Sequence, residues 1–280
     1  MIGVSPAYYL SKYGEDFTIN DVLQEVHILK ELGFSAFQLE VTKRTYLKDW
    51  TRENLEKLAQ ECTKEHMQVS QVVAHFWIDN LSSVEGIQKG LDQREVEQFL
   101  DMVDQLPHCR QLTVPFGRFK ADLDILANTA AYASLLQKLT ATLEKLCVLG
   151  AQQGTFIALE LQPGAIIQGV AGFHHMLSLL NGHPSLAYNL DTGHAHATKD
   201  VVELIPVRLG QRIVGTHLCD NATLENLSLT PGEGSIDWSA VCTALKQNHY
   251  KGSYDLEIMC KRGEVEEKYS QGLRFISQFV

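Results

Sequence analysis

Positive charge is scarce in this chain. Lysine and arginine number 24 against 34 aspartates and glutamates, which gives a formal net charge of -10 over 280 residues. Phosphate backbones and anionic membrane surfaces repel a chain with this balance on average. We therefore expect neither a nucleic acid nor a membrane among its partners.

Long apolar segments and paired cysteine motifs are also missing. No run reaches the roughly 18 consecutive apolar residues that a membrane-spanning helix needs. The opening stretch, "MIGVSPAYYLSKYGED", lacks the basic and apolar regions of a secretory signal. No two cysteines form a C-x-x-C pair, and most lie inside apolar runs, where free thiols behave as small hydrophobes. We expect a cytoplasmic protein with six free cysteines: Cys62, Cys109, Cys147, Cys219, Cys242 and Cys260.

No linker-like or low-complexity stretch divides the chain, which predicts one domain over residues 1–280. Short apolar runs rich in β-branched and aromatic residues alternate with longer segments of helical period. This pattern is typical of βα units and a parallel sheet. Eight runs are predicted as strands: "GVSPAYYL" from Gly3, "AFQLEVT" from Ala36, "VSQVVAHFW" from Val69, "QLTVPFG" from Gln111, "FIALELQPG" from Phe156, "LAYNLDTGH" from Leu186, "IVGTHLCDN" from Ile213 and "SYDLEIM" from Ser253.

Segments with apolar residues at spacings of three and four lie between these runs. They predict helices over residues 21–32, 52–66, 94–106, 132–150, 237–250 and 266–280. Eight strands with a helix after nearly every one predict an α/β fold, the (β/α)8 TIM barrel. A doubly wound open sheet is the alternative, but "SPAYYLSKYGED" after the first strand contains neither a glycine fingerprint nor a P-loop.

Polar residues at the ends of the late strands carry the functional signal, because barrel enzymes build their sites where strands end at the C-terminal face. Glu160, Asp191, His217 and Glu257 each lie at or near the end of an apolar run, and none of these runs contains lysine or arginine. Buried carboxylates need a compensating cation. We predict one divalent metal ion held by these four residues. An oxygen-rich set with one imidazole suits Mn²⁺, Mg²⁺ or Co²⁺ better than Zn²⁺, which stays an option.

Each of these residues also has a plain structural interpretation. Asp191, before Thr192 and Gly193, could cap a helix. His217 could be a hydrogen-bonded interior histidine, and Glu160 and Glu257 could point outward to lysines on the helices. The metal interpretation is favoured because all four residues occupy corresponding strand ends of one predicted barrel.

Further polar residues are candidates for binding a substrate: His194, His75, Glu40 and Arg118. His194 follows Asp191 by one short turn and could face the same cavity, whereas His196 is expected to face away. His75 could bind a hydroxyl, and its neighbours Phe76 and Trp77 could either cover an apolar sugar face or pack in the core. Glu40 and Arg118 lie at strand ends, where each could also be a rim charge.

From the second strand to its end, the chain resembles the xylose-isomerase-like (β/α)8 barrel superfamily. This superfamily includes ketose 3-epimerases, inosose isomerases and dehydratases, hydroxypyruvate isomerases and the AP endonuclease IV group. The likeness rests on a Glu in strand five, a D-x-x-H turn after strand six, a His in strand seven and a Glu in strand eight. "HLCDN" and "PGEGSIDW" are similar to the family's strand-seven segment and the following loop. The resemblance implies that Glu160, Asp191, His217 and Glu257 bind one divalent ion.

The resemblance also implies a reaction on a sugar, inosose or related α-hydroxy carbonyl compound. Isomerisation or epimerisation removes a proton from the carbon beside C=O, and a metal that chelates the two oxygens stabilises the resulting cis-enediolate. In the family's epimerases the two metal-bound glutamates exchange proton roles, which implies Glu160 and Glu257 as the acid/base pair and His194 as a residue that orients a substrate oxygen.

Two departures from the ketohexose epimerases leave alternatives open. Those enzymes carry a Glu and an Arg where this chain has Ile166 and Thr223. An inosose dehydratase-type lyase, an AP endonuclease IV-like phosphodiesterase and a non-catalytic metal-binding barrel stay as alternatives. The nuclease is disfavoured by the acidic charge and by the missing histidine after His217. No cluster of arginine or lysine marks a phosphate pocket, and a homo-oligomer is compatible with the sequence.

Overall fold

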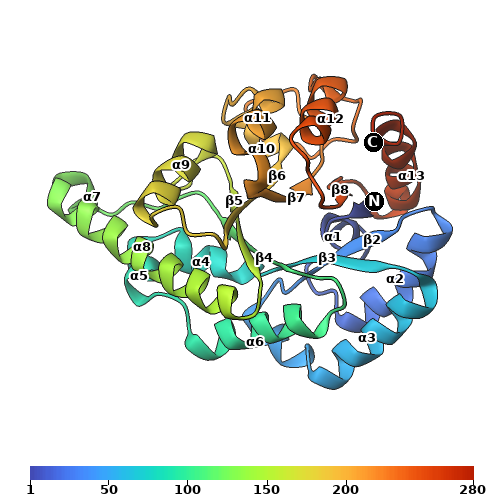
Figure 1. Cartoon of the computed structure of the whole chain (residues 1–280), viewed down its shortest axis with the longest axis horizontal. Coiled ribbons are helices and arrows are strands. Elements are labelled where there is room, and N and C mark those ends of the chain that lie inside the picture. The colour runs from blue at the N-terminus through green and yellow to red at the C-terminus, as the bar shows by residue number, and fades with distance from the viewer.

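The computed structural model describes residues 1–280, and eight parallel strands form its centre (Figure 1). Their order in the sheet is β7-β6-β5-β4-β3-β2-β1-β8, so every strand lies beside its neighbour in the sequence and β1 lies beside β8. This arrangement, with helices between the strands, confirms the predicted (β/α)8 barrel. The strands are β1 (Ile2–Val4), β2 (Ala36–Glu40), β3 (Gln68–Val73), β4 (Gln111–Phe116), β5 (Phe156–Leu161), β6 (Leu186–Asp191), β7 (Ile213–His217) and β8 (Tyr254–Leu256).

The barrel closes between β7 and β8 through a short set of hydrogen bonds. Leu218 N donates to Asp255 O at 2.7 Å, and Glu257 N donates to Leu218 O at 2.9 Å. The Thr216 hydroxyl extends this pairing, because it donates to Ser253 O at 2.9 Å and accepts from Asp255 N at 3.1 Å. Closure therefore brings the ends of β7 and β8 together, where two of the predicted site residues lie.

The helices surround the strands on the outside (Figure 1). All six predicted helices are present, with ends that shift by up to four residues. In α6, for example, Asp92 caps the first turn and the buried face carries Val96, Phe99 and Val103. The helices are α1 (Ala7–Tyr13), α2 (Ile19–Glu31), α3 (Arg52–Glu65), α4 (Ile78–Leu81), α5 (Val84–Lys89), α6 (Gln93–Gln105), α7 (Leu123–Ala127), α8 (Thr129–Gln152), α9 (Gly169–Leu179), α10 (Thr192–Ala197), α11 (Ile205–Leu209), α12 (Trp238–Gln247) and α13 (Val265–Ile276). None of them is both long and apolar enough to cross a membrane.

All eight predicted strands extend past the observed strand ends, and several of them run into helices or helical turns. The first run was expected to stay extended to Leu10, but helix α1 begins at Ala7, directly after Pro6. Proline fixes φ near the helical value, and the buried side chains of Tyr8 and Tyr9 belong to this helix rather than to a strand.

The third run ends as a strand at Val73, and a 3-10 turn, η2 (His75–Trp77), follows. Phe76 and Trp77 are buried against Phe99, with ring centroids 5.6 and 4.9 Å away. Of the two interpretations left open for these aromatic residues, the structure supports packing in the core rather than contact with a sugar face.

The interior of the barrel is unusually polar for a (β/α)8 fold, whose interior is ordinarily filled by Val, Ile and Leu. Hydrogen bonds cross the barrel between strands that are not neighbours, such as Gln71 to Asn189 at 3.2 Å and Ser70 to Asp255 at 2.7 Å. Gln38, Gln71, Asn189 and Asp255 are all nearly fully buried. A hydrogen-bonded polar layer thus lies directly beneath the C-terminal ends of the strands.

Candidate metal centre

Four strands deliver the four predicted ligand residues to the same end of the barrel. Glu160 is in β5, Asp191 ends β6, His217 ends β7, and Glu257 directly follows β8. Asp191 and His217 are paired in register across the β6–β7 ladder. Because parallel strands end at one face, residues almost 100 positions apart in the sequence become neighbours.

The side chains of these residues converge on one point. His217 Nδ1 lies 3.1 Å from Glu257 Oε2 and 3.4 Å from Glu160 Oε2. Ligand atoms of Glu160, Asp191 and His217 all lie within 4.8 Å of one another, and so do those of Asp191, Cys219 and Glu257. The glutamates do not point outward to lysines, so that alternative is wrong for both of them.

Several buried atoms of the cluster lack any hydrogen-bond partner. They are Asp191 Oδ2, His217 Nδ1 and Glu257 Oε2. An unpaired buried polar atom costs about 1–3 kcal/mol, and more when it is charged. Three such atoms facing one another fit a shared cation, because carboxylate oxygens and an imidazole nitrogen are all metal ligands. The residues present therefore fit a divalent ion.

The electrostatics of the cluster point the same way. Burial, together with Glu257 and Glu160, raises the pKa of Asp191 well above its ordinary value. Burial alone would lower the pKa of His217, but Glu257 and Glu160 raise it well above 6.5. Burial also favours neutral Glu257, yet His217 beside it lowers the pKa of this carboxyl. No lysine or arginine pairs with these carboxylates, and the raised pKa values favour protonation of Asp191 and His217 when no cation is bound.

Asp191 combines the two interpretations that its sequence context allowed. Its Oδ1 accepts a hydrogen bond from His194 N at 2.8 Å and so caps α10. Its Oδ2 has no hydrogen-bond partner and faces the cluster. The cap fixes the orientation of the carboxylate, which leaves one oxygen available as a ligand.

The two histidines of α10 face different ways, as expected. His194 Nε2 lies 3.3 Å from Asp191 Oδ2 and 3.7 Å from Glu160 Oε1, while Asn226 Nδ2 lies 3.2 Å from its Nδ1. Burial lowers the pKa of His194, which favours the neutral ring. His196 instead contacts the Ser235 hydroxyl at 3.1 Å, away from the cluster.

The remaining substrate-binding candidates differ in their surroundings. His75 Nδ1 lies 2.8 Å from Glu40 Oε1, and Glu40 is buried with a second oxygen that has no partner. Glu40 is therefore not a rim charge. Arg118 is exposed in the loop after β4, where its side chain lies against Gly164 of the loop after β5. The structure brings Arg118 to the correct end of the barrel but not into the cluster.

Cys219 is a member of the cluster that sequence reasoning missed. Its thiol donates to Asp191 Oδ1 at 3.7 Å, and burial together with Asp191 and Glu257 raises its pKa well above 9. A side chain at Gly193 would clash with Cys219 and Asn226, so this glycine is needed for the close approach of the two loops. The sequence signal that could have indicated Cys219 is its position two residues after the predicted ligand His217.

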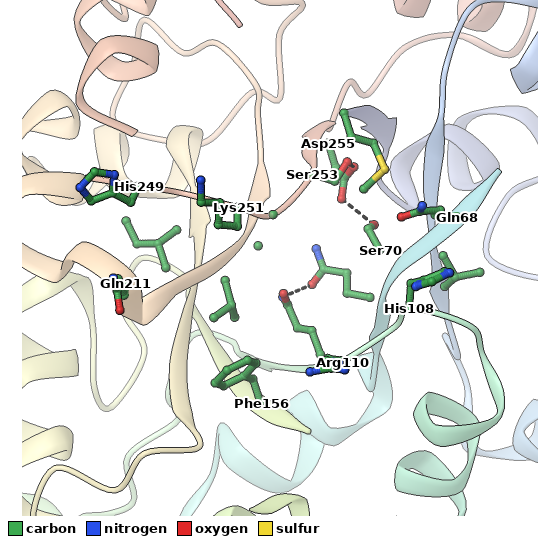
Figure 2. Close-up of a pocket in the computed structure, with 18 residues that line it drawn as sticks. Gln68, Ser70, His108, Arg110, Phe156, Gln211, His249, Lys251, Ser253 and Asp255 are labelled. Carbon is green, nitrogen blue, oxygen red and sulfur yellow. Dashed lines mark hydrogen bonds between the residues drawn. The ribbon is translucent and has the colours of Figure 1, made fainter. Parts of the chain in front are cut away.

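A cavity lies at the opposite end of the barrel. It has a volume of about 510 Å³ and is lined by residues that begin the strands, including Gln68, Gln111 and Phe156 (Figure 2). Asp255 and Ser70 also line it. We place the candidate site at the C-terminal ends instead, because the unpaired carboxylate and imidazole atoms lie there.

Comparisons with known proteins agree with this architecture. A family model described as "Xylose isomerase-like TIM barrel" matches residues 26–279. No curated protein sequence matches the chain.

Solved structures match over nearly the whole length at low identity, which shows the fold alone. A crystal structure of the IOLI protein with a binding zinc atom has a TM-score of 0.72 and 15% identity, and the match covers 100% of this chain and 99% of that one. The 3-keto-D-glucoside 4-epimerase YcjR from E. coli has a TM-score of 0.73 and 15% identity, with 99% and 98% covered. A D-allulose 3-epimerase from Methylomonas sp., in complex with D-allulose, has a TM-score of 0.72 and 15% identity, with 100% and 96% covered.

The His75–Glu40 pair predicts a pH dependence that NMR can measure. Burial alone would lower the pKa of His75, but Glu40 raises it to about 9. Glu40→Gln should therefore move the titration midpoint of His75 down, below its wild-type value. Because the pKa is raised in the folded state, the pair stabilises the fold below the ordinary pKa of about 6.5 and loses this contribution as pH rises through the folded value. A wild-type midpoint near 6.5 would contradict the ion pair between buried Glu40 and the partly exposed His75.

Proposed function

Because this chain belongs to the family of xylose isomerase-like TIM barrels, we propose that it is a divalent-metal-dependent isomerase or epimerase. Its substrate is a sugar, an inosose or a related α-hydroxy carbonyl compound. The single observation that carries the proposal is the cluster of two buried carboxylates, the partly buried Glu257 carboxylate and one imidazole, with unpaired atoms, at the C-terminal end of the barrel. Substrate sites of this fold are built at that end.

Glu160, Asp191, His217 and Glu257 would hold the ion. When bound, the ion would supply an electrophile that polarises the carbonyl group of the substrate. Three carboxylates and one imidazole form a ligand set that suits Mn²⁺, Mg²⁺ or Co²⁺, and Zn²⁺ is the metal named with one of the similar structures. The Cys219 thiol donates to Asp191 Oδ1 at 3.7 Å, and in this scheme it supports that carboxylate rather than acting as a ligand.

The positions of the two glutamates support a role in proton transfer. Glu160 and Glu257 approach His217 Nδ1 from two different strands, at 3.4 and 3.1 Å. One carboxylate would take the proton from the carbon beside the carbonyl, and the other would return a proton to the neighbouring position or to the opposite face. This exchange of roles is what isomerisation and epimerisation share.

His194 and His75 would bind and orient the hydroxyl groups of the substrate. His194 lies next to Glu160 and is supported from behind by Asn226. Glu40 raises the pKa of His75 to about 9, so the His75 ring would present a cationic N–H to the substrate at neutral pH. Arg118, at the rim, would contact the end of the substrate that is farther from the cluster.

The first prediction of this proposal concerns metal binding. Asp191→Asn should lower the affinity for Mn²⁺ or Co²⁺ by at least about 100-fold, because the unpaired oxygen loses its charge. The amide keeps an oxygen that can still cap α10. Isothermal titration calorimetry on the purified protein measures both values.

Asp237→Asn is the matched control, because Asp237 caps α12 in the same way, with Ala240 N at 3.0 Å, but lies outside the cluster. Its affinity should equal that of the wild type. Absence of saturable binding of Mn²⁺, Co²⁺, Mg²⁺ and Zn²⁺ by the wild type would refute the site.

The second prediction concerns catalysis. Glu257→Gln should keep the fold and much of the metal affinity but lower kcat by about 10²- to 10⁴-fold, because the amide cannot accept a proton. A panel of ketoses, inososes and hydroxypyruvate identifies the substrate. In D₂O, turnover by the wild type should place deuterium on the substrate carbon that loses its proton.

Glu267→Gln, an exposed position on α13, is the control and should turn over normally. Full activity in Glu257→Gln would show that the assignment of the two glutamates is wrong.

A further inference from the structure

His217 has a different type of partner on each ring nitrogen. Nδ1 faces Glu257 and Glu160 at 3.1 and 3.4 Å without a hydrogen bond of good geometry. Nε2 lies 2.8 Å from Gln38 Oε1, a side chain of β2 that is completely buried inside the barrel. The ring is therefore held from beneath by an uncharged side chain.

The chemistry around Gln38 decides which end of its amide faces the histidine. Its other end contacts Asp255 Oδ2 at 2.8 Å and the Thr216 carbonyl oxygen at 3.3 Å. A backbone carbonyl only accepts hydrogen bonds, so the NH₂ group must lie on this side. The amide oxygen of Gln38 consequently faces His217. An amide oxygen only accepts hydrogen bonds, so Nε2 of His217 must carry a proton and donate.

Asp255 is itself held by several strands. Ser70 of β3 donates to its Oδ2 at 2.7 Å, and the Ser253 hydroxyl donates to its Oδ1. Figure 2 shows the bond between Ser70 and Asp255 among the residues that line the N-terminal cavity. The chain Ser70–Asp255–Gln38–His217 thus runs through the barrel, from this cavity to the cluster at the other end.

The geometry points to Asp255 and Gln38 as a positioning clamp for His217. The clamp keeps the proton on Nε2 and turns Nδ1 toward the three carboxylates, so that Nδ1 is the nitrogen available to a metal. This inference rests on the proposed function, because orienting Nδ1 serves the metal site. The hydrogen bond between Gln38 and His217 does not itself require a metal. Partners of this kind typically change metal affinity by about 10- to 100-fold when they are removed.

Gln38→Met tests the clamp. Methionine has a similar shape, but its thioether is only a weak acceptor for the hydrogen bond from His217 Nε2–H. Calorimetry with Mn²⁺ should show an affinity about 10- to 100-fold below that of the wild type. Gln71→Met is the matched control: Gln71 is equally buried in the barrel interior, and its hydrogen bonds go to Asn189, Gln111 and Thr113 rather than to the cluster. Wild-type affinity in Gln38→Met, or an equal loss in both variants, would overturn the clamp.

A second measurement uses the wild-type protein without metal. The Nε2–H proton of His217 should give a slowly exchanging signal in a ¹H–¹⁵N spectrum, assigned by its loss in His217→Gln. The signal should persist in Gln71→Met and be lost or exchange rapidly in Gln38→Met. A wild-type protein that shows this signal but binds no metal would contradict the proposed function and leave the clamp intact. A wild type without the signal would overturn the clamp, whatever the metal affinity.

Discussion

The repulsion between three carboxylates, two buried and one partly buried, at one end of a barrel is the constraint on which the rest of this structure depends. Glu160, Asp191 and Glu257 meet around His217, and no lysine or arginine neutralises them. Such a group is stable only when protons or a cation compensate its charge. The raised pKa values of Asp191 and His217 favour protonation of the cluster without a cation, and the unpaired oxygens are the atoms that we propose bind a divalent ion.

The surrounding structure serves to hold these charges in place. The helix cap fixes Asp191, the β7–β8 closure brings Glu257 beside His217, and the polar interior supports the imidazole from beneath. An apolar barrel interior would be easier to pack, but it would offer no acceptor for the hydrogen bond from His217 Nε2–H. The buried glutamines and Asp255 therefore connect the unusual interior of this barrel to the chemistry at its end.

The sequence predicted the fold and the four cluster residues because both depend on local patterns. Strand ends can be read from apolar runs, and parallel strands in a barrel bring their ends to one face. The partners of these residues could not be predicted in the same way. Gln38 and His217 are 179 positions apart and meet across the barrel, and the sequence contains no signal for that contact. Helix α1 was missed because its buried tyrosines and the preceding strand form one continuous apolar run.

The most direct test is a crystal soaked with Mn²⁺ and measured for anomalous scattering at the manganese edge. The account predicts one strong peak in contact with Glu160, Asp191, His217 Nδ1 and Glu257. A peak bound elsewhere, for example at Asp255 in the N-terminal cavity, or no peak at all at saturating Mn²⁺, would contradict it.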